Sequence, residues 1–199
     1  MRKSRLEAFS DGVIAILITI MVLELRAPHG ADWGALRAVL PSLLSYLMSF
    51  VFLGIYWNNH HHLLQATERI NGATLWANLH LLFWLSLIPF VTSWMDDSHN
   101  AAVPTAAYGV VLLLCALAFT ILVRTLLAAH PTKNVRLAEA VGSDRKGKLS
   151  LLFYVAAIPL AFVHPTIADA LYVGVALVWL VPDSRIESRF RGAAEQESG

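Results

Sequence analysis

Long apolar stretches separated by short polar segments run along most of the sequence. Crossing the hydrocarbon core of a bilayer takes about 20 residues of helix, and somewhat shorter runs are tolerated. The strands of a membrane β-barrel would alternate apolar and polar residues with a period of two, and these stretches do not. The pattern therefore predicts six transmembrane helices, over residues 8–26, 36–57, 73–95, 105–128, 149–165 and 167–182.

These spans predict an all-α, polytopic membrane protein with a single domain, residues 1–187. The last two spans are short and are separated by His164 and Pro165, so we expect a tight helical hairpin there. Residues 188–199 are polar, and we expect them to form a disordered cytoplasmic tail.

Positively charged residues set the predicted orientation, because cytoplasmic loops of membrane proteins carry an excess of Lys and Arg. If the N-terminus is inside, every Lys and Arg falls on the cytoplasmic side except Arg26 and Arg37. Both termini are therefore expected to be cytoplasmic.

Composition supports a membrane protein and excludes several functions. The chain of 199 residues is 57% hydrophobic and 15% charged, whereas soluble domains carry about 25% charged residues. The net charge of +1 gives no basic field for nucleic acid, and one cysteine, Cys115, provides no disulfide framework. No nucleophile-and-base set or phosphate-binding loop is apparent, so we do not expect an enzyme.

A stripe of four residues follows one face of the first span at helical spacing: Gly12, Ile16, Thr19 and Leu23, with Ile20 at its edge. Small and branched residues suit helix packing in lipid, so the stripe is consistent with a simple packing seam. Alternatively, several copies of the stripe surround an axis. Apolar rings could then gate by dewetting, and threonine hydroxyls could replace part of the water shell of an ion.

The first span also begins with polar residues that need partners in a membrane. Ser10 and Asp11 could cap the helix N-terminus or complement its dipole. We favour instead a polar clasp that fixes this helix against its neighbours. The residues that we expect to form the clasp are Arg5, Phe9, Ser10, Asp11, Trp57, His61 and His80.

Three adjacent histidines, His60, His61 and His62, suggest a metal site at first sight. Neighbouring residues on a helix are separated by about 100°, so one zinc ion could not easily bind all three. We therefore expect no metal and no cofactor.

Several motifs together resemble the prokaryotic TMEM175 family of potassium channels. The most specific is Arg-x-x-x-Phe-Ser-Asp at residues 5–11, followed by an apolar helix with Thr19. The supporting matches cover most of the chain: Tyr56, Trp57, His60 and His61; Ser86–Phe90 with Thr92; Tyr108 and Gly109; and Trp179, Pro182, Asp183, Arg185, Ile186 and Glu187.

The resemblance implies a homotetramer of six-helix subunits in the bacterial plasma (inner) membrane, with the lipid bilayer and monovalent cations as partners. It implies a pore lined by the first helix, with K⁺ as the permeant ion. Ile16 and Leu23 then occupy the positions of the apolar constriction, and Thr19 occupies that of a threonine layer. The sequence has no Thr-Val-Gly-Tyr-Gly stretch, which excludes a conventional carbonyl-lined filter.

Other functions remain open at this point. One alternative is a proton-coupled secondary transporter that uses Asp11, His80 and His61 as a relay, and another is a proton-permeable cation channel. Transporters of that kind often show inverted repeats and broken midplane helices, and neither is clear here. A membrane scaffold without transport activity would use the stripe only as an oligomer seam.

Overall fold

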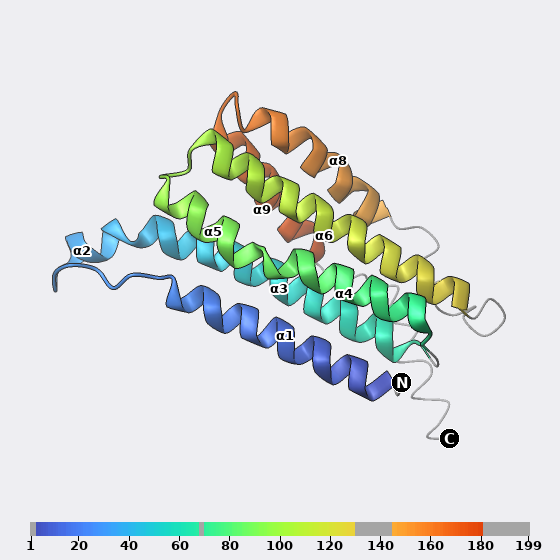
Figure 1. Ribbon diagram of the computed structural model, residues 1–199. Helices are drawn as coiled ribbons and strands as arrows, with labels where there is room; N and C mark the ends of the chain where they lie inside the picture. The colour runs from blue at the N-terminus through green and yellow to red at the C-terminus, as the bar shows by residue number, and fades with distance from the viewer. Residues whose placement is uncertain (1–2, 68–69, 130–144, 181–199) are drawn as a thin grey trace, which may run out of the picture.

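The structure, a computed structural model, describes residues 3–67, 70–129 and 145–180, and all regular structure within them is helical (Figure 1). The helices are α1 (Lys3–Leu23), α2 (Trp33–Ala38), α3 (Leu40–Gln65), α4 (Gly72–Ser86), α5 (Ile88–Asp97), α6 (Ala102–Ala129), α8 (Arg145–Leu160) and α9 (Pro165–Leu180).

Four helical segments in the described part of the chain are long and apolar enough to cross a membrane: Lys3–Leu23, Leu40–Gln65, Gly72–Asp97 and Ala102–Ala129. The third consists of α4 and α5, which are separated by a break at Leu87. The break comes two residues before Pro89, which has no N–H to donate and whose ring clashes with the preceding helical turn. These four segments correspond to the first four predicted spans.

The last two helices, α8 and α9, are shorter than the others that were predicted as spans. Each has 16 residues, which corresponds to a helix about 24 Å long. They pack against each other and are joined by a short turn at residues 161–164, as expected for a helical hairpin. The predicted tail, residues 188–199, lies outside the described residues.

Among the helices, α1 and α3 extend furthest beyond their predicted boundaries. α1 begins at Lys3, so Ser10 and Asp11 lie more than one turn inside the helix and do not cap it. α3 continues to Gln65, eight residues past the predicted end of its span. The short helix α2 was not predicted; Asp32 caps it by accepting a hydrogen bond from the backbone N–H of Ala35 at 2.7 Å.

The helices pack as an elongated bundle with α1 along one edge (Figure 1). α1 packs against α3, α4 and α5, whereas α8 and α9 pack against α6 on the other side. One consequence for function is that the described residues cover only one side of α1.

Candidate pore helix

The buried face of α1 consists of residues three or four apart. These side chains are Leu6, Ser10, Ile14, Leu17 and Met21, and they face α3, α4 and α5. All are apolar except Ser10. The spacing places them on one stripe of the helix, which anchors α1 to the bundle.

The opposite face of α1 carries the stripe that the sequence singles out, and no part of the chain that the structure describes covers it. Ile16 is 57% exposed and Leu23 is 80% exposed, while Gly12 and Thr19 are also exposed. Ile20, at the edge of the stripe, is 41% exposed. This face is apolar along its length, so it is suited to lipid, to another protein surface or to the wall of a pore.

Thr19 brings a hydroxyl group to this apolar face. Its Oγ1 donates a hydrogen bond to the carbonyl oxygen of Ile16 at 2.8 Å. Because the proton is used within the helix, the oxygen lone pairs remain available as acceptors. Hydroxyl oxygens in this state can replace part of the water shell of a cation.

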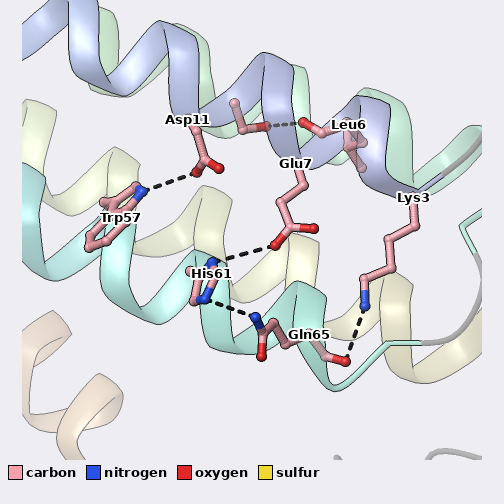
Figure 2. A network of polar contacts seen from close by, with 8 residues as sticks. Lys3, Leu6, Glu7, Asp11, Trp57, His61 and Gln65 are labelled. Atoms are coloured by element: carbon pink, nitrogen blue, oxygen red, sulfur yellow. Dashed lines mark hydrogen bonds and ion pairs between the residues drawn. The ribbon is translucent and has the colours of Figure 1, made fainter.

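A ladder of polar contacts joins the N-terminal half of α1 to α3 (Figure 2). Lys3 Nζ donates to the carbonyl oxygen of Gln65 at 3.1 Å, and Trp57 Nε1 donates to Asp11 Oδ1 at 3.0 Å. Between these two rungs, Glu7 Oε1 lies 3.4 Å from His61 Nδ1. The rungs recur at every fourth residue of both helices, which is the spacing of one helical face.

The side chains of α3 within the ladder also support one another. The rings of Trp57 and His61 stack with their centroids 5.9 Å apart. Gln65 Nε2 and His61 Nε2 are 3.0 Å apart, so the amide donates and the ring nitrogen accepts. His61 therefore presents its Nδ1–H to Glu7, which fixes the tautomer of the ring.

A second set of polar contacts lies in the core, where α1, α3 and α4 meet. Ser10, Asn78 and His60 are all fully buried. His60 Nε2 donates to Asn78 Oδ1 at 2.7 Å, and Asn78 Nδ2 donates to Ser10 Oγ at 2.9 Å. Ser10 Oγ in turn donates to the carbonyl oxygen of Leu6 at 2.9 Å. These three hydrogen bonds form a buried polar line in which each group donates to the next, and the line joins α3, α4 and α1.

The structure brings part of the predicted clasp together. Ser10, Asp11, Trp57 and His61 all contribute to the contacts that hold α1. Three predicted members lie elsewhere: Phe9 is 51% exposed, Arg5 is exposed, and His80 is exposed on α4, where it accepts a hydrogen bond from Trp84 Nε1 at 2.8 Å.

Sequence reasoning left four contributors out of the clasp: Lys3, Glu7, His60 and Gln65. It considered Asn78 as a possible partner of Asp11, whereas the structure joins Asn78 to Ser10 and His60. A signal for the ladder exists in the sequence, because Lys3, Glu7 and Asp11 are four residues apart, as are Trp57, His61 and Gln65. The buried line has no such signal, because its members come from three separate helices.

The relay and metal hypotheses find little geometric support. Asp11, His61 and His80 each have a different partner, and no hydrogen bond among the described residues links them. Within the same residues, no group of three or more His, Cys, Asp or Glu side chains is placed to hold a metal ion. His60 is fully buried whereas His62 is exposed, so these two rings point apart, while the rings of His61 and His62 meet edge to face with centroids 5.6 Å apart.

The fold and the four long apolar helices define the class of this chain: it is a multi-pass α-helical membrane protein. The profile of the family described as "Endosomal/lysosomal potassium channel TMEM175" matches residues 5–89. A protein named as a potassium channel, from Chryseobacterium sp. (strain P1-3), is 52% identical over 191 residues, covering 96% of this chain and 99% of that protein. The chain therefore belongs to the TMEM175 family, a family of ion channels and not of enzymes.

Two further comparisons agree with this assignment. The crystal structure of a lysosomal potassium-selective channel TMEM175 homolog from Chamaesiphon minutus superimposes with a TM-score of 0.78 at 26% identity, covering 90% of this chain and 96% of that one. A Gallus gallus protein named as the endosomal/lysosomal proton channel TMEM175 is 36% identical over 114 residues, covering 49% of this chain and 23% of that protein. The family resemblance predicted from the sequence is thus confirmed.

Proposed function

We propose that this chain forms a homotetrameric, potassium-preferring cation channel in the bacterial plasma (inner) membrane. Each subunit, residues 1–187, crosses the membrane six times with both termini in the cytoplasm. The pore lies on the axis of the tetramer and is lined by α1 of each copy. The relative from Chryseobacterium sp. and the solved homologue are both named as potassium channels, which supports the ion that we propose.

The observation that carries this proposal is the uncovered face of α1. Its opposite face is fixed by buried apolar contacts and by the ladder to α3, so the uncovered face has a defined direction. A single chain with one such face cannot enclose a pore, whereas several copies around an axis can. The scaffold hypothesis accounts for the exposure of this face but not for the combination of a hydroxyl layer and two bulky apolar positions.

Each residue of the stripe then has a role. Ile16 and Leu23 form apolar rings that narrow the pore and gate it by dewetting. Thr19 places a ring of hydroxyl oxygens between them and contributes to the preference for K⁺. Gly12 has no side chain to narrow the pore on the cytoplasmic side, and Ile20 packs at the edge of the stripe.

The clasp fixes the position of α1 against the neighbouring helices, so that the stripe faces the pore. Asp11, Ser10 and His61 of each copy bond to neighbouring helices and not to the permeant ion. A carboxylate that accepts a hydrogen bond from Trp57 and lies away from the stripe is suited to positioning α1. We therefore assign these residues to the structure of the pore and not to ion binding.

A second candidate function is proton permeation through the same pore. The vertebrate relatives are named as proton channels, and the match to the Gallus gallus protein favours this possibility. Proton flux and potassium flux are separable, because a pH-sensitive dye inside vesicles reports only the first.

The test is ion flux into proteoliposomes that contain the purified protein. We would compare gradients of K⁺ and Na⁺ for the wild type, for Ile16→Asn and for Ile121→Asn. Ile121 lies on α6 and is 44% exposed, so its substitution controls for placing a polar amide on an exposed helix face. A pH-sensitive dye in the same vesicles measures protons.

The proposal predicts passive K⁺ flux that exceeds Na⁺ flux, that changes in Ile16→Asn and that is unchanged in Ile121→Asn. Equal changes in both variants would argue against α1 as the pore wall. Flux that occurs only with an imposed proton gradient would support the transporter instead. Absence of flux from correctly assembled protein would contradict the channel.

A further inference from the structure

Arg5 is the charged member of the Arg-x-x-x-Phe-Ser-Asp motif that takes no part in the contacts holding α1. Its side chain is exposed, and it forms no hydrogen bond or ion pair with any residue that the structure describes. An arginine at the end of a membrane helix commonly reaches lipid headgroups, and that role needs no specific position on the helix. Arg5, in contrast, occupies a particular position on α1, in line with the stripe.

Arg5 lies on the same line of α1 as the stripe. It precedes Gly12 by seven residues, which is about two turns of helix, and both belong to one continuous helix. The two acidic side chains of α1 are turned away from it. Glu7 faces His61 and Asp11 faces Trp57, both on α3 (Figure 2).

We propose that Arg5 of each copy contributes to a ring of positive charge at the cytoplasmic entrance of the pore, where it lowers the local concentration of cations. The proposal rests on the proposed function, in which α1 lines the pore. The ladder has a second consequence in this arrangement. It directs Lys3, Glu7 and Asp11 toward α3 and leaves Arg5 as the charged side chain of α1 on the face of the stripe. Arg5 is thus a residue that determines conductance and not one that binds the ion.

The expected size of the effect follows from the distance between the charges and the pore axis. At about 10 Å, four charges in a high-dielectric mouth change the local cation concentration about two- to threefold at ~0.1 M salt. At ~1 M salt the Debye length is about 3 Å, so the effect nearly disappears. Dependence on ionic strength therefore distinguishes a charge at the mouth from a change in pore shape.

The experiment measures K⁺ current in excised patches from giant vesicles, with reagents added to the cytoplasmic side. Arg5→Cys is modified with a positively charged or a negatively charged thiol reagent. The native cysteine, Cys115, is buried and is retained in all variants. Ser4→Cys is the matched control, because Ser4 is also exposed but lies about a quarter turn away from Arg5. Arg5→Lys and Arg5→Gln complete the set.

We expect outward K⁺ conductance at ~0.1 M salt to rise two- to threefold in Arg5→Gln and to stay at the wild-type value in Arg5→Lys. The positive reagent should return Arg5→Cys to the wild-type conductance, and the negative reagent should raise it further. Both changes should vanish at ~1 M salt, and Ser4→Cys should respond less.

Conductance that is insensitive to both reagents, in channels that Ile16→Asn alters, would overturn the role of Arg5 while leaving the pore in place. If Ile16→Asn also has no effect, the proposed function fails first. Loss of tetramers in Arg5→Gln but not in Arg5→Lys would assign the charge to a contact within the assembly, which also overturns the proposal.

Discussion

Replacing Asn78 with alanine tests whether the buried polar line fixes α1 to the bundle. The substitution removes both hydrogen bonds of the Asn78 amide, one from His60 at 2.7 Å and one to Ser10 at 2.9 Å. Ser10 keeps its bond to the carbonyl oxygen of Leu6. His60 keeps none, because its Nδ1 is buried without a hydrogen-bond partner among the described residues.

The expected loss of stability can be worked from these contacts. Hydrogen bonds between membrane helices contribute about 0.6 kcal/mol on average and at most about 1.7 kcal/mol. A buried donor without a partner costs a further 1–3 kcal/mol or so. Two lost bonds and one orphaned N–H of His60 therefore predict a decrease of about 2–4 kcal/mol in the free energy of unfolding.

The measurement is the unfolding of the purified protein in mixed micelles as the fraction of denaturing detergent is raised. Asn59→Ala is the matched control, because Asn59 is partly buried and donates only to the carbonyl oxygen of Ile55 on its own helix, at 2.8 Å. It should lose about 1 kcal/mol or less.

The reasoning would be refuted if the Asn78 and Asn59 variants lost stability equally. A double-mutant cycle of Asn78→Ala with Ser10→Ala adds a second check, because residues that share a hydrogen bond should show a coupling energy. Additive effects of the two substitutions would mean that the bond between α1 and α4 contributes little.

Two further predictions concern packing and selectivity. In Gly109→Ala, the new Cβ would overlap Tyr172 Oη, so we expect the free energy of unfolding to fall by about 1–3 kcal/mol. Gly174→Ala is the control, because its new Cβ would meet nothing within 4 Å, and it should be neutral or slightly stabilising. Thermal unfolding checks both variants, and equal melting temperatures would contradict the close approach of α6 and α9. In Thr19→Val, the K⁺/Na⁺ flux ratio should fall with little change in stability, whereas Thr120→Val, whose hydroxyl donates to the carbonyl oxygen of Ala116, should leave the ratio unchanged. A flux ratio that changes with neither substitution would contradict the proposed contribution of Thr19 to the preference for K⁺.

The long apolar runs made the membrane class and the first four spans predictable from the sequence. Hydropathy locates a span because the bilayer sets its length, but it says little about where a helix ends beyond the membrane. α1 begins at Lys3 and α3 continues to Gln65 because polar side chains of each helix find partners on the other. These pairings join residues far apart in the sequence, so neither helix alone indicates them.

Helical periodicity also identified the stripe of α1 from the sequence, since residues three and four apart share a face. Periodicity alone could not show which face the rest of the chain covers, because both faces are largely apolar. The clasp was predicted only in part for a related reason. Polarity shows that a side chain needs a partner, but it does not show whether that partner is a neighbouring helix, as for Asp11, or a residue of the same helix, as for His80.

The most direct test of the central claim, that the stripe of α1 lines the ion path, is block of Leu23→Cys channels by Ag⁺. Leu23 is 80% exposed on the stripe, whereas the adjacent Val22 is 47% exposed and lies about 100° away around the helix. The account predicts that Ag⁺ blocks K⁺ current through Leu23→Cys and leaves current through Val22→Cys unchanged. Block of Val22→Cys but not of Leu23→Cys, or equal block of both, would contradict it.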